Sequence, residues 1–480
     1  MRVFDLTNSE LLTNVVIIVG VPVVLFCVAA AVTLTFFHVN TRTSKIHLKT
    51  PTPQPIVGNL LQLSANRHRK HDWILDNFRT LKTETFAVLI PTPFLTYRPD
   101  LIMTANVKNV EHILKTNFVN YEKGFLFREN LSCFLGSGIF TVDGSSWKSQ
   151  RKIASHIFTV KNVCILIAFG CDFGCLETPD NPLPFASAFD RVQGIVCDRF
   201  INPFWFITEF FTGERIELNK NLDIVNTFAK EMIVEARKRN LANDHDNNED
   251  VSKNDLLDFF LESKNEDGTP LKDSQLRDVV LNFIIAGRDT TAQALSWGIW
   301  EICKNPVVEE KLLKEAKAVI RDKKFPNYEE VKELKYSQAV FYEILRLYPS
   351  VPANLKLAVN DDVLPDGTLI PAGSVVSMAP YSMGRLESIW GKDAEEFNPS
   401  RWFDISGNLI KESSSKFPAF HSGPRTCLGQ HLATHEAITV LSTLVRDFHF
   451  ELLPNQDITY GDSLTLPMKN PLLVKVCKRQ

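Results

Sequence analysis

Cysteine is scarce in this chain, and its spacing fits no common cross-link or zinc site. Nine cysteines are scattered over 480 residues, an odd number, and none forms a CxxC or CxxH pair. This pattern excludes a regular disulfide framework and a zinc knuckle. Cys171 and Cys175 are four positions apart, but no histidine lies near them, so we expect no metal site there. The cysteine content favours a protein that folds in a reducing compartment.

A large net charge, internal repeats and low-complexity blocks are also missing. The 53 lysines and arginines nearly balance the 56 aspartates and glutamates, which leaves a formal net charge of −3. This balance argues against nucleic acid as an electrostatic partner. By contrast, 44% of the residues are hydrophobic and 23% are charged, a composition that excludes global disorder and predicts a sizeable packed core.

One long stretch near the N-terminus carries no charge. It runs from Val15 to Phe37 and holds 23 residues, which as a helix span roughly 34 Å, enough to cross a hydrocarbon core of about 30 Å. A cleaved signal peptide is the alternative, but its apolar region is usually about 7–15 residues long. We therefore expect residues 1–40 to be an N-terminal membrane anchor with its transmembrane helix over about 15–37.

Basic residues and prolines follow this span. Arg42, Lys45 and Lys49 come after it, whereas Arg2 is the one basic residue before it. The positive-inside bias therefore places the C-terminal part in the cytosol. Residues 41–55 are basic and rich in proline, and we expect a stiff, extended linker there.

Apolar spacing predicts helices along most of residues 56–480. Segments 274–303, 325–348 and 431–445 all show helical spacing. Strand-like pieces, such as 374–380 and 472–477, are few and short. The polar and charged segment 237–255 is expected to be an exposed loop. The fold class expected is one mainly α domain with small β-sheets.

The segment FHSGPRTCLGQ, which begins at Phe420, places a cysteine directly ahead of the last predicted helix. Free backbone N–H groups at the N-terminal end of a helix stabilise a thiolate, and Cys427 lies there. Gly423 permits a tight turn that presents the sulfur, and Gly429 lets the helix approach something flat and large. Arg425 can form a charge-assisted bond to a carboxylate, and Phe420 can shield the sulfur. The alternative is a buried structural cysteine beside an ordinary loop arginine.

Four shorter motifs precede this segment in a set order. They are WKSQR, AGRDTT, EILR and FNPSRW. Taken singly, each has a plain structural interpretation, such as a surface salt bridge for the Glu–Arg pair of EILR or a polar helix face for AGRDTT. Together with the cysteine segment they span Trp147 to Gly429, the larger part of the chain after the linker. In this order they resemble the cytochrome P-450 superfamily, the haem-thiolate monooxygenases.

The resemblance implies a site for haem b, iron protoporphyrin IX. Cys427 would be the metal ligand, the axial ligand of the haem iron, and would favour cleavage of the O–O bond. Arg425 would meet a haem propionate. Trp147 and Arg151, one helical turn apart, resemble the propionate-binding helix. The remaining cofactor-binding residues implied are Phe420, Gly423 and Gly429.

Two further groups of residues take roles from the resemblance. Asp289 and Thr290 resemble the acid–alcohol pair that delivers protons in the oxygen-binding groove, where a threonine bonding back to a carbonyl bends the helix. Glu343 and Arg346, neighbours on one helix face, would form a structural cluster with Arg401. Such a cluster is specific only if all of its charges are paired.

The implied reaction inserts one atom of dioxygen into a substrate C–H bond and releases the other as water. Electrons would come from NADPH through a separate flavoprotein reductase, because the chain has no flavin or nicotinamide fingerprint. Lys148 and Lys152 are either solvated or help to dock an acidic reductase surface. The protein would be a single-pass protein of the endoplasmic reticulum membrane, with the lipid bilayer as a partner and its catalytic domain facing the cytosol.

Two long segments narrow the resemblance. RLYPSVPANLKLAVNDDVLPDGT and YSMGRLESIWGKDAEEFNPSRW look most like the fatty-acid and alkane terminal-hydroxylase groups of plants and fungi. An apolar substrate, a fatty acid or alkane chain, is therefore implied.

One departure concerns the chain after Phe158. The resembled groups carry there one whole helix and part of the next, and a segment of about 50 residues is absent here. This absence keeps open a non-catalytic or misfolded relic. A reductase-independent haem-thiolate isomerase or dehydratase is the other alternative, which the complete Asp–Thr pair argues against.

Overall fold

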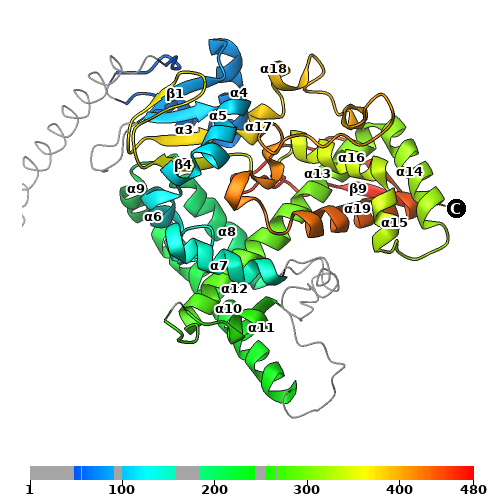
Figure 1. Ribbon diagram of the computed structural model, residues 1–480, viewed down its shortest axis with the longest axis horizontal. Coiled ribbons are helices and arrows are strands. Elements are labelled where there is room, and N and C mark those ends of the chain that lie inside the picture. The colour runs from blue at the N-terminus through cyan, green and yellow to red at the C-terminus, as the bar shows by residue number, and fades with distance from the viewer. Residues whose placement is uncertain are drawn as a thin grey trace, which may run out of the picture.

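The computed structural model describes residues 48–55, 57–90, 100–157, 183–243, 256–265 and 267–479. In Figure 1 a sheet lies at the upper left, one helical group at the right and another below. The expected membrane span and residues 41–47 of the linker lie outside the described residues. Within the described ranges, no helix combines the length and apolar character needed to cross a bilayer.

A five-stranded sheet joins two distant parts of the chain. Its strand order is β1-β2-β7-β4-β3, with β2 and β7 parallel and the other neighbours antiparallel. The bounds are β1 Thr85–Leu89, β2 Asp100–Thr104, β3 Tyr121–Glu122, β4 Asn354–Ala358 and β7 Val375–Met378. The pairing of β3 with β4 therefore sets residues near 120 beside residues near 357.

Two small antiparallel sheets of two strands each are also described. Strands β5 (Asp362–Val363) and β6 (Leu369–Ile370) form one, and β8 (Phe448–Leu452) and β9 (Val474–Lys478) form the other. The expectation of a mainly α fold with small β-sheets is confirmed for the described residues.

Helices make up most of the described chain. They are α3 Leu60–Ala65, α4 Lys70–Leu81, α5 Val107–Glu111, α6 Gly124–Leu135, α7 Gly144–Ile157, α8 Pro184–Asp198, α9 Trp205–Thr212, α10 Glu214–Asn243, α11 Leu256–Glu262, α12 Asp273–Ile284, α13 Thr290–Lys304, α14 Pro306–Ile320, α15 Tyr328–Glu333, α16 Lys335–Leu347, α17 Pro380–Met383, α18 Glu387–Trp390 and α19 Gln430–Asp447.

Three large buried clusters make up most of the core of the described chain. One joins α6, α8, α10 and α12, a second joins α13, α14, α16 and α19, and a third packs α4 and α5 against the five-stranded sheet. The first two clusters meet along the α12–α13 element, so this element runs through the middle of the helical part, as Figure 1 shows.

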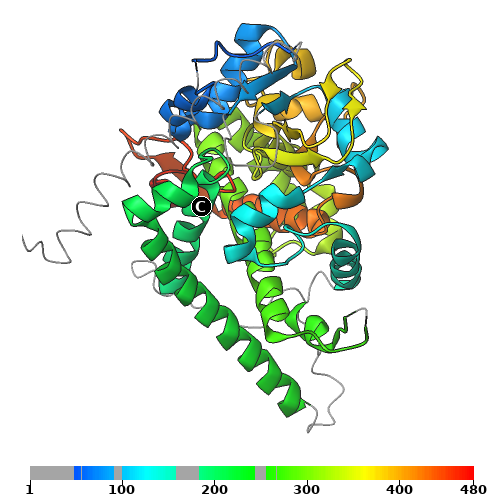
Figure 2. The same ribbon diagram turned by 90° about the vertical axis from the view of Figure 1, so that its left-hand side faces the viewer.

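The polar segment 237–255 differs from its prediction. Residues 237–243 are the last two turns of α10, which Figure 2 shows extending away from the rest of the molecule; residues 244–255 lie outside the described chain. Arginine, lysine, leucine and alanine are strong helix formers, so this charged sequence continues a helix already anchored by buried Met232 and Ile233.

Candidate active site

The cysteine segment forms a tight loop between two short helical turns and α19. The backbone N–H of Cys427 donates to the Phe420 carbonyl at 2.9 Å. Gly423 has a φ of +68°, and a Cβ at this position would lie 1.9 Å from the Leu114 carbonyl oxygen. Only glycine fits such a position. Gly429 is the N-cap of α19, so the thiol precedes a helix N-terminus by three residues.

The Cys427 side chain is exposed, although protein atoms surround it closely. Burial raises the pKa of its thiol, while the backbone N–H of Gly429 and the guanidinium of Arg151 oppose that rise. The sulfur is therefore open to a group bound within the fold rather than packed against apolar neighbours. The interpretation of Cys427 as a buried structural cysteine does not fit this position.

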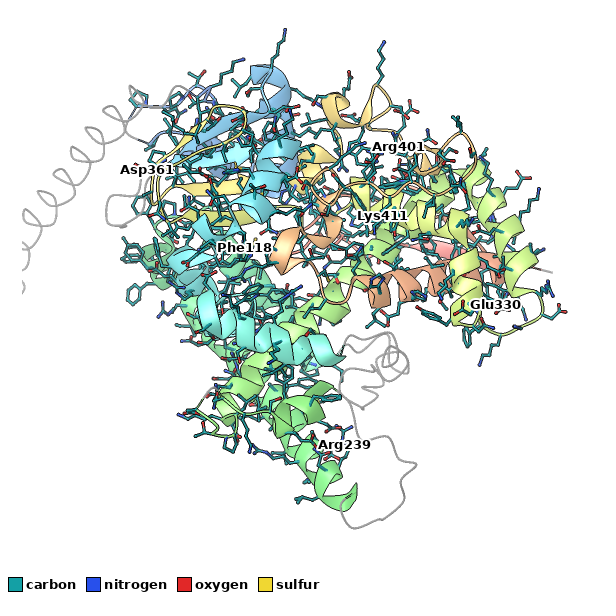
Figure 3. The ribbon with its side chains drawn as sticks, in the orientation of Figure 1. Phe118, Arg239, Glu330, Asp361, Arg401 and Lys411 are labelled. Atoms are coloured by element: carbon teal, nitrogen blue, oxygen red, sulfur yellow. The ribbon has the colours of Figure 1, made fainter. Side chains whose placement is uncertain are left out.

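Trp147 and Arg151 on α7 lie beside this loop. Trp147 is 6% exposed, and its ring contacts Phe118, labelled in Figure 3, with ring centres 5.7 Å apart. The Arg425 guanidinium lies 4.5 Å from the centre of the Trp147 ring. Arg151 donates from Nη2 to the Thr426 carbonyl at 2.8 Å. The structure thus brings the WKSQR motif and the cysteine segment together.

A group of basic side chains surrounds Arg425. Arg425 donates from Nη2 to Asp143 at 2.7 Å and to the Val142 carbonyl at 2.8 Å, yet its buried Nε has no hydrogen-bond partner among the described residues. The other members are Arg151 on α7, His421 directly after the 3₁₀ turn Pro418–Phe420, Lys123 between β3 and α6, and Lys356 in β4.

Burial controls the charge of this group. It lowers the pKa of Lys123 to about 7, with Arg425 adding to the effect. It lowers the pKa of Lys356 well below the ordinary value, helped by Lys123 and Arg425. Burial also lowers the pKa of His421 to about 3, so its ring is neutral at physiological pH. Its Nδ1 lies 2.7 Å from the Ser422 amide nitrogen and 2.8 Å from the Ser422 carbonyl oxygen. In the tautomer whose Nδ1 accepts from the Ser422 N–H, Nε2 carries the ring proton and is a donor.

Three donors of this group have no partner in the described chain. They are Arg425 Nε, Lys356 Nζ and His421 Nε2. Unpaired buried donors are costly, and buried cations more so. One anionic group with several oxygens would satisfy all three and would restore the charge of the lysines. The donors therefore fit the carboxylates of a haem, and the open thiol of Cys427 fits its metal.

The AGRDTT motif interrupts the long predicted helix. Residues Ile285–Asp289 form a π-helical turn between α12 and α13. The Thr290 hydroxyl donates back to the Ala286 carbonyl at 2.6 Å, and Ser350 donates to the Thr290 carbonyl at 2.8 Å. A Cβ added to Gly287 would meet no atom within 4 Å, so the backbone faces open space at this turn.

Asp289 is buried at the end of the same turn. Its side chain is 4% exposed and accepts bonds from Arg288 Nε at 2.5 Å and from Gln193 Nε2 at 2.8 Å. Burial raises the pKa of its carboxyl, and Arg288 and Gln193 oppose that rise. A carboxyl held in this way retains its proton at a higher pH than an exposed aspartate does.

Glu343, Arg346 and Arg401 form one buried cluster. Glu343 accepts two bonds from Arg346, both at 2.8 Å, and one from Arg401 Nε at 2.9 Å. Trp402 Nε1 donates to the same carboxylate at 3.0 Å. The side chains of Glu343 and Arg346 are fully buried. Both arginines also donate to backbone carbonyls, so every charge in the cluster is paired, which is what specificity requires.

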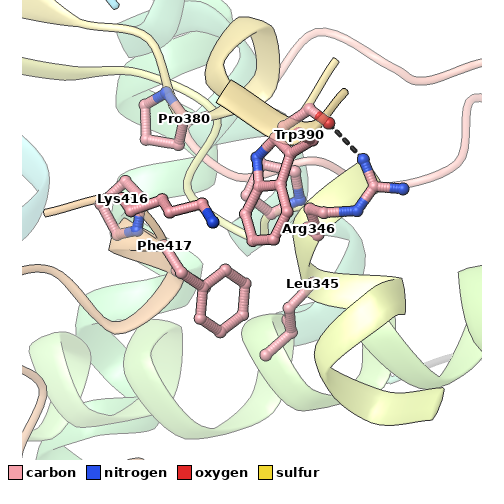
Figure 4. A pocket seen from close by; sticks show the side chains of 10 residues that line it. Leu345, Arg346, Pro380, Trp390, Lys416 and Phe417 are labelled. Atoms are coloured by element: carbon pink, nitrogen blue, oxygen red, sulfur yellow. Dashed lines mark hydrogen bonds between the residues drawn. The ribbon is translucent and has the colours of Figure 1, made fainter. Parts of the chain in front are cut away.

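Packing connects this cluster to the cysteine loop. A small pocket is lined by Leu345, Arg346, Trp390, Lys416 and Phe417, and Figure 4 shows the Trp390 ring between Lys416 and Arg346. The Lys416 ammonium lies 4.5 Å from the centre of that ring and the Arg346 guanidinium 5.4 Å. Phe417, ten residues before Cys427, also packs against Trp402 with ring centres 4.9 Å apart, so the cluster contacts the segment that leads to the thiol.

The sequence did not reveal Lys123, Lys356, His421 or Gln193. In β4, the leucines on either side of Lys356 suggest by alternation that the lysine faces solvent, yet Lys356 is 1% exposed and both leucines are less deeply buried. His421 and Gln193 carry no local pattern that separates them from ordinary polar residues.

Comparison with known proteins agrees with this geometry. The sequence model of the cytochrome P-450 family matches residues 157–477. Cytochrome P-450 704B1 of Arabidopsis thaliana is 34% identical over 508 aligned positions, which cover 89% of this chain and 95% of that protein. Cytochrome P-450 monooxygenase cyp1 of Mycosarcoma maydis is 34% identical over 494 positions, 90% of this chain and 76% of that protein.

A third relative shows that this chain is shorter than a member of the family. Cytochrome P-450 94B1 of Arabidopsis thaliana is 33% identical over 527 aligned positions, which cover 97% of this chain and 98% of that protein. This alignment is longer than the whole chain of 480 residues. That relative therefore contains residues that have no counterpart here.

Proposed function

The chain belongs to the cytochrome P-450 family of monooxygenases, and on that premise we propose that it hydroxylates an apolar chain, a fatty acid or an alkane. The observation that carries the proposal is the open Cys427 thiol beside three unpartnered buried donors. The substrate class is supported by segments 346–368 and 381–402, which resemble fatty-acid and alkane terminal hydroxylases.

The residues of the cysteine loop and of the basic group around Arg425 would hold the haem. Cys427 would ligate haem iron, and Arg425, Lys356 and His421 would hold the haem carboxylates with their free donors. When bound, haem supplies the chemistry that activates dioxygen. Phe420 packs with the apolar cluster of α13 and α16 and limits water at the loop.

Proton delivery falls to the π-helical turn. The Thr290 hydroxyl donates to Ala286, so its oxygen lone pairs remain able to accept a bond from a water or a bound group. Burial raises the pKa of Asp289 above that of an exposed aspartate, and the residue ends the π-helical turn directly before Thr290, the first residue of α13. Its carboxyl is thus the proton donor and Thr290 Oγ1 the atom that orders the acceptor.

Electrons are proposed to come from NADPH through a separate flavoprotein reductase. Lys148 and Lys152 on α7 are exposed next to the cysteine loop, and they support docking of an acidic reductase surface.

A membrane location is part of the proposal, with one pass through the endoplasmic reticulum membrane and the catalytic domain in the cytosol. The apolar stretch 15–37 supports an anchor. A second support is a cluster of exposed apolar side chains on α9 and the start of α10: Phe206, Ile207, Phe210, Phe211 and Ile216. Exposed apolar patches of this kind favour contact with lipid.

The test is a reconstitution of the full chain with haem, a reductase and NADPH. We expect a carbon-monoxide band at about 450 nm in the reduced protein, and NADPH-dependent hydroxylation of a fatty acid or alkane. Absence of the band would show a non-catalytic relic. Product formation without the reductase would show an isomerase or dehydratase instead.

Thr290→Ala is expected to leave the haem content nearly intact and to divert reducing equivalents to peroxide. Without the hydroxyl, the proton from Asp289 is no longer directed, and we expect product per NADPH to fall by about tenfold or more. The measurement is the ratio of product, peroxide and NADPH consumed. Ser296→Ala is the matched control, because Ser296 also bonds back to a carbonyl four residues earlier on α13, at 2.9 Å. Tight coupling in Thr290→Ala would remove Thr290 from the mechanism.

A further inference from the structure

Gln193 is a buried amide on α8 that contacts the candidate acid from a position 96 residues earlier in the chain. Its side chain is 2% exposed, and its Nε2 donates to Asp289 Oδ2 at 2.8 Å. Its Oε1 accepts no hydrogen bond from any described residue. Because an unpaired buried oxygen is costly, the bond to Asp289 is what holds the amide in this orientation.

The free Oε1 gives Gln193 a second way to hold Asp289. An ionised carboxylate accepts from Nε2, as observed. A protonated carboxyl has an O–H that needs an acceptor, and rotation of the amide by half a turn presents Oε1 in place of Nε2. The amide can therefore hold the carboxyl group in both protonation states. A leucine of similar size can hold neither.

The other side of Asp289 faces a charged pair. Its Oδ1 accepts from Arg288, which also pairs with Asp190 on α8 and lies 4.9 Å from the centre of the Phe189 ring. Asp190 and Gln193 are three positions apart and share one helix face. Arg288 and Asp190 are partly exposed to water, at 35% and 64%, whereas Gln193 is not. The buried half of the contact therefore depends on Gln193.

We propose that Gln193 is a positioning residue for proton delivery, whose amide holds the Asp289 carboxyl in place as it loses and regains its proton. This inference rests on the proposed function, in which Asp289 is the proton donor. Through Asp289, it gives α8 an indirect part in the chemistry of the α12–α13 turn.

Gln193→Leu tests the proposal in the haem-loaded full chain. We expect retained haem content and about tenfold less product per NADPH, because the carboxyl is no longer held. Loss of a bond that favours the carboxylate also raises the pKa of Asp289. In the plot of product per NADPH against pH, the limb set by the titration of Asp289 should therefore move to higher pH.

Gln193→Glu separates positioning from packing. A neutral glutamic acid offers one donor and one acceptor, as the amide does, so coupling should recover as pH is lowered, whereas Gln193→Leu should not recover. A side chain that only filled space would show no such pH-dependent rescue. Gln193→Glu also keeps the test open if Gln193→Leu does not fold.

The pKa of Asp289 can also be measured in the resting protein, with no substrate turnover. The infrared band of its protonated carboxyl, assigned by the loss of the band in Asp289→Asn, reports that pKa. It decides the inference even if no fatty-acid product is found and the proposed function fails. Gln293→Leu is the matched control: Gln293 lies on α13 and bonds to Thr465 and Leu466 instead. An unchanged band and pH profile in Gln193→Leu, or equal shifts in Gln293→Leu, would overturn the proposal.

Discussion

Cys427→Ala is expected to abolish both the band at about 450 nm and all turnover. The thiol lies exposed three residues ahead of α19, and its loop is held by the Cys427–Phe420 backbone bond and by a glycine that no other residue can replace. Alanine keeps that backbone and removes only the sulfur. The measurements are the carbon-monoxide difference spectrum and product formation.

The control for this change is Cys303→Ala. Cys303 is a free, partly buried cysteine on α13 whose pKa burial raises to about 11, so it is an inert thiol. This variant should keep the full band. A band retained by Cys427→Ala would show that the axial ligand is another residue.

Insertion of a homologous segment after Phe158 is expected to raise the haem content and the melting temperature of the chain. The position lies outside the described residues, between Ile157 at the end of α7 and Leu183 before α8. In the resembled fold a missing helix packs in the bundle around the α12–α13 element. Loss of ten well-buried side chains, at about 1.5–3 kcal/mol each, would exceed the net stability of a typical domain, about 5–15 kcal/mol.

An insert of equal length built from glycine and serine is the matched control. It restores the spacing without apolar surface, and we expect it to leave haem content low. Equal haem incorporation and equal melting temperature for the chain as it stands and the chain with the homologous insert would show that the shorter bundle is self-sufficient.

The helices were predicted well where apolar spacing and helix propensity agree. The spacing of segment 431–445 matches α19, whose buried face includes Ala437, Ile438 and Leu441. The same spacing could not show the breaks in two other segments. The predicted helix over 325–348 is divided at Leu334, and that over 274–303 contains the π-helical turn. One extra residue in a turn hardly changes an apolar pattern.

The sequence by itself determined the family and the residues that bear its motifs. Cys427, Gly423 and Arg425 lie in one loop, and Glu343 and Arg346 lie on one helix face, so the roles proposed for them follow from spacings of a few residues. Arg401 lies in a separate motif, and its assignment to the cluster with Glu343 and Arg346 followed from the order of the motifs.

Tertiary structure alone decided what surrounds those residues. Lys356 faces inward because β4 pairs with β3 and β7, against its own alternation pattern, and burial then lowers its pKa. Gln193 reaches Asp289 because α8 packs where the π-helical turn opens. Contacts between residues about a hundred positions apart are selected by packing, and the charge of a buried group is set by its neighbours, so neither is encoded in local spacing.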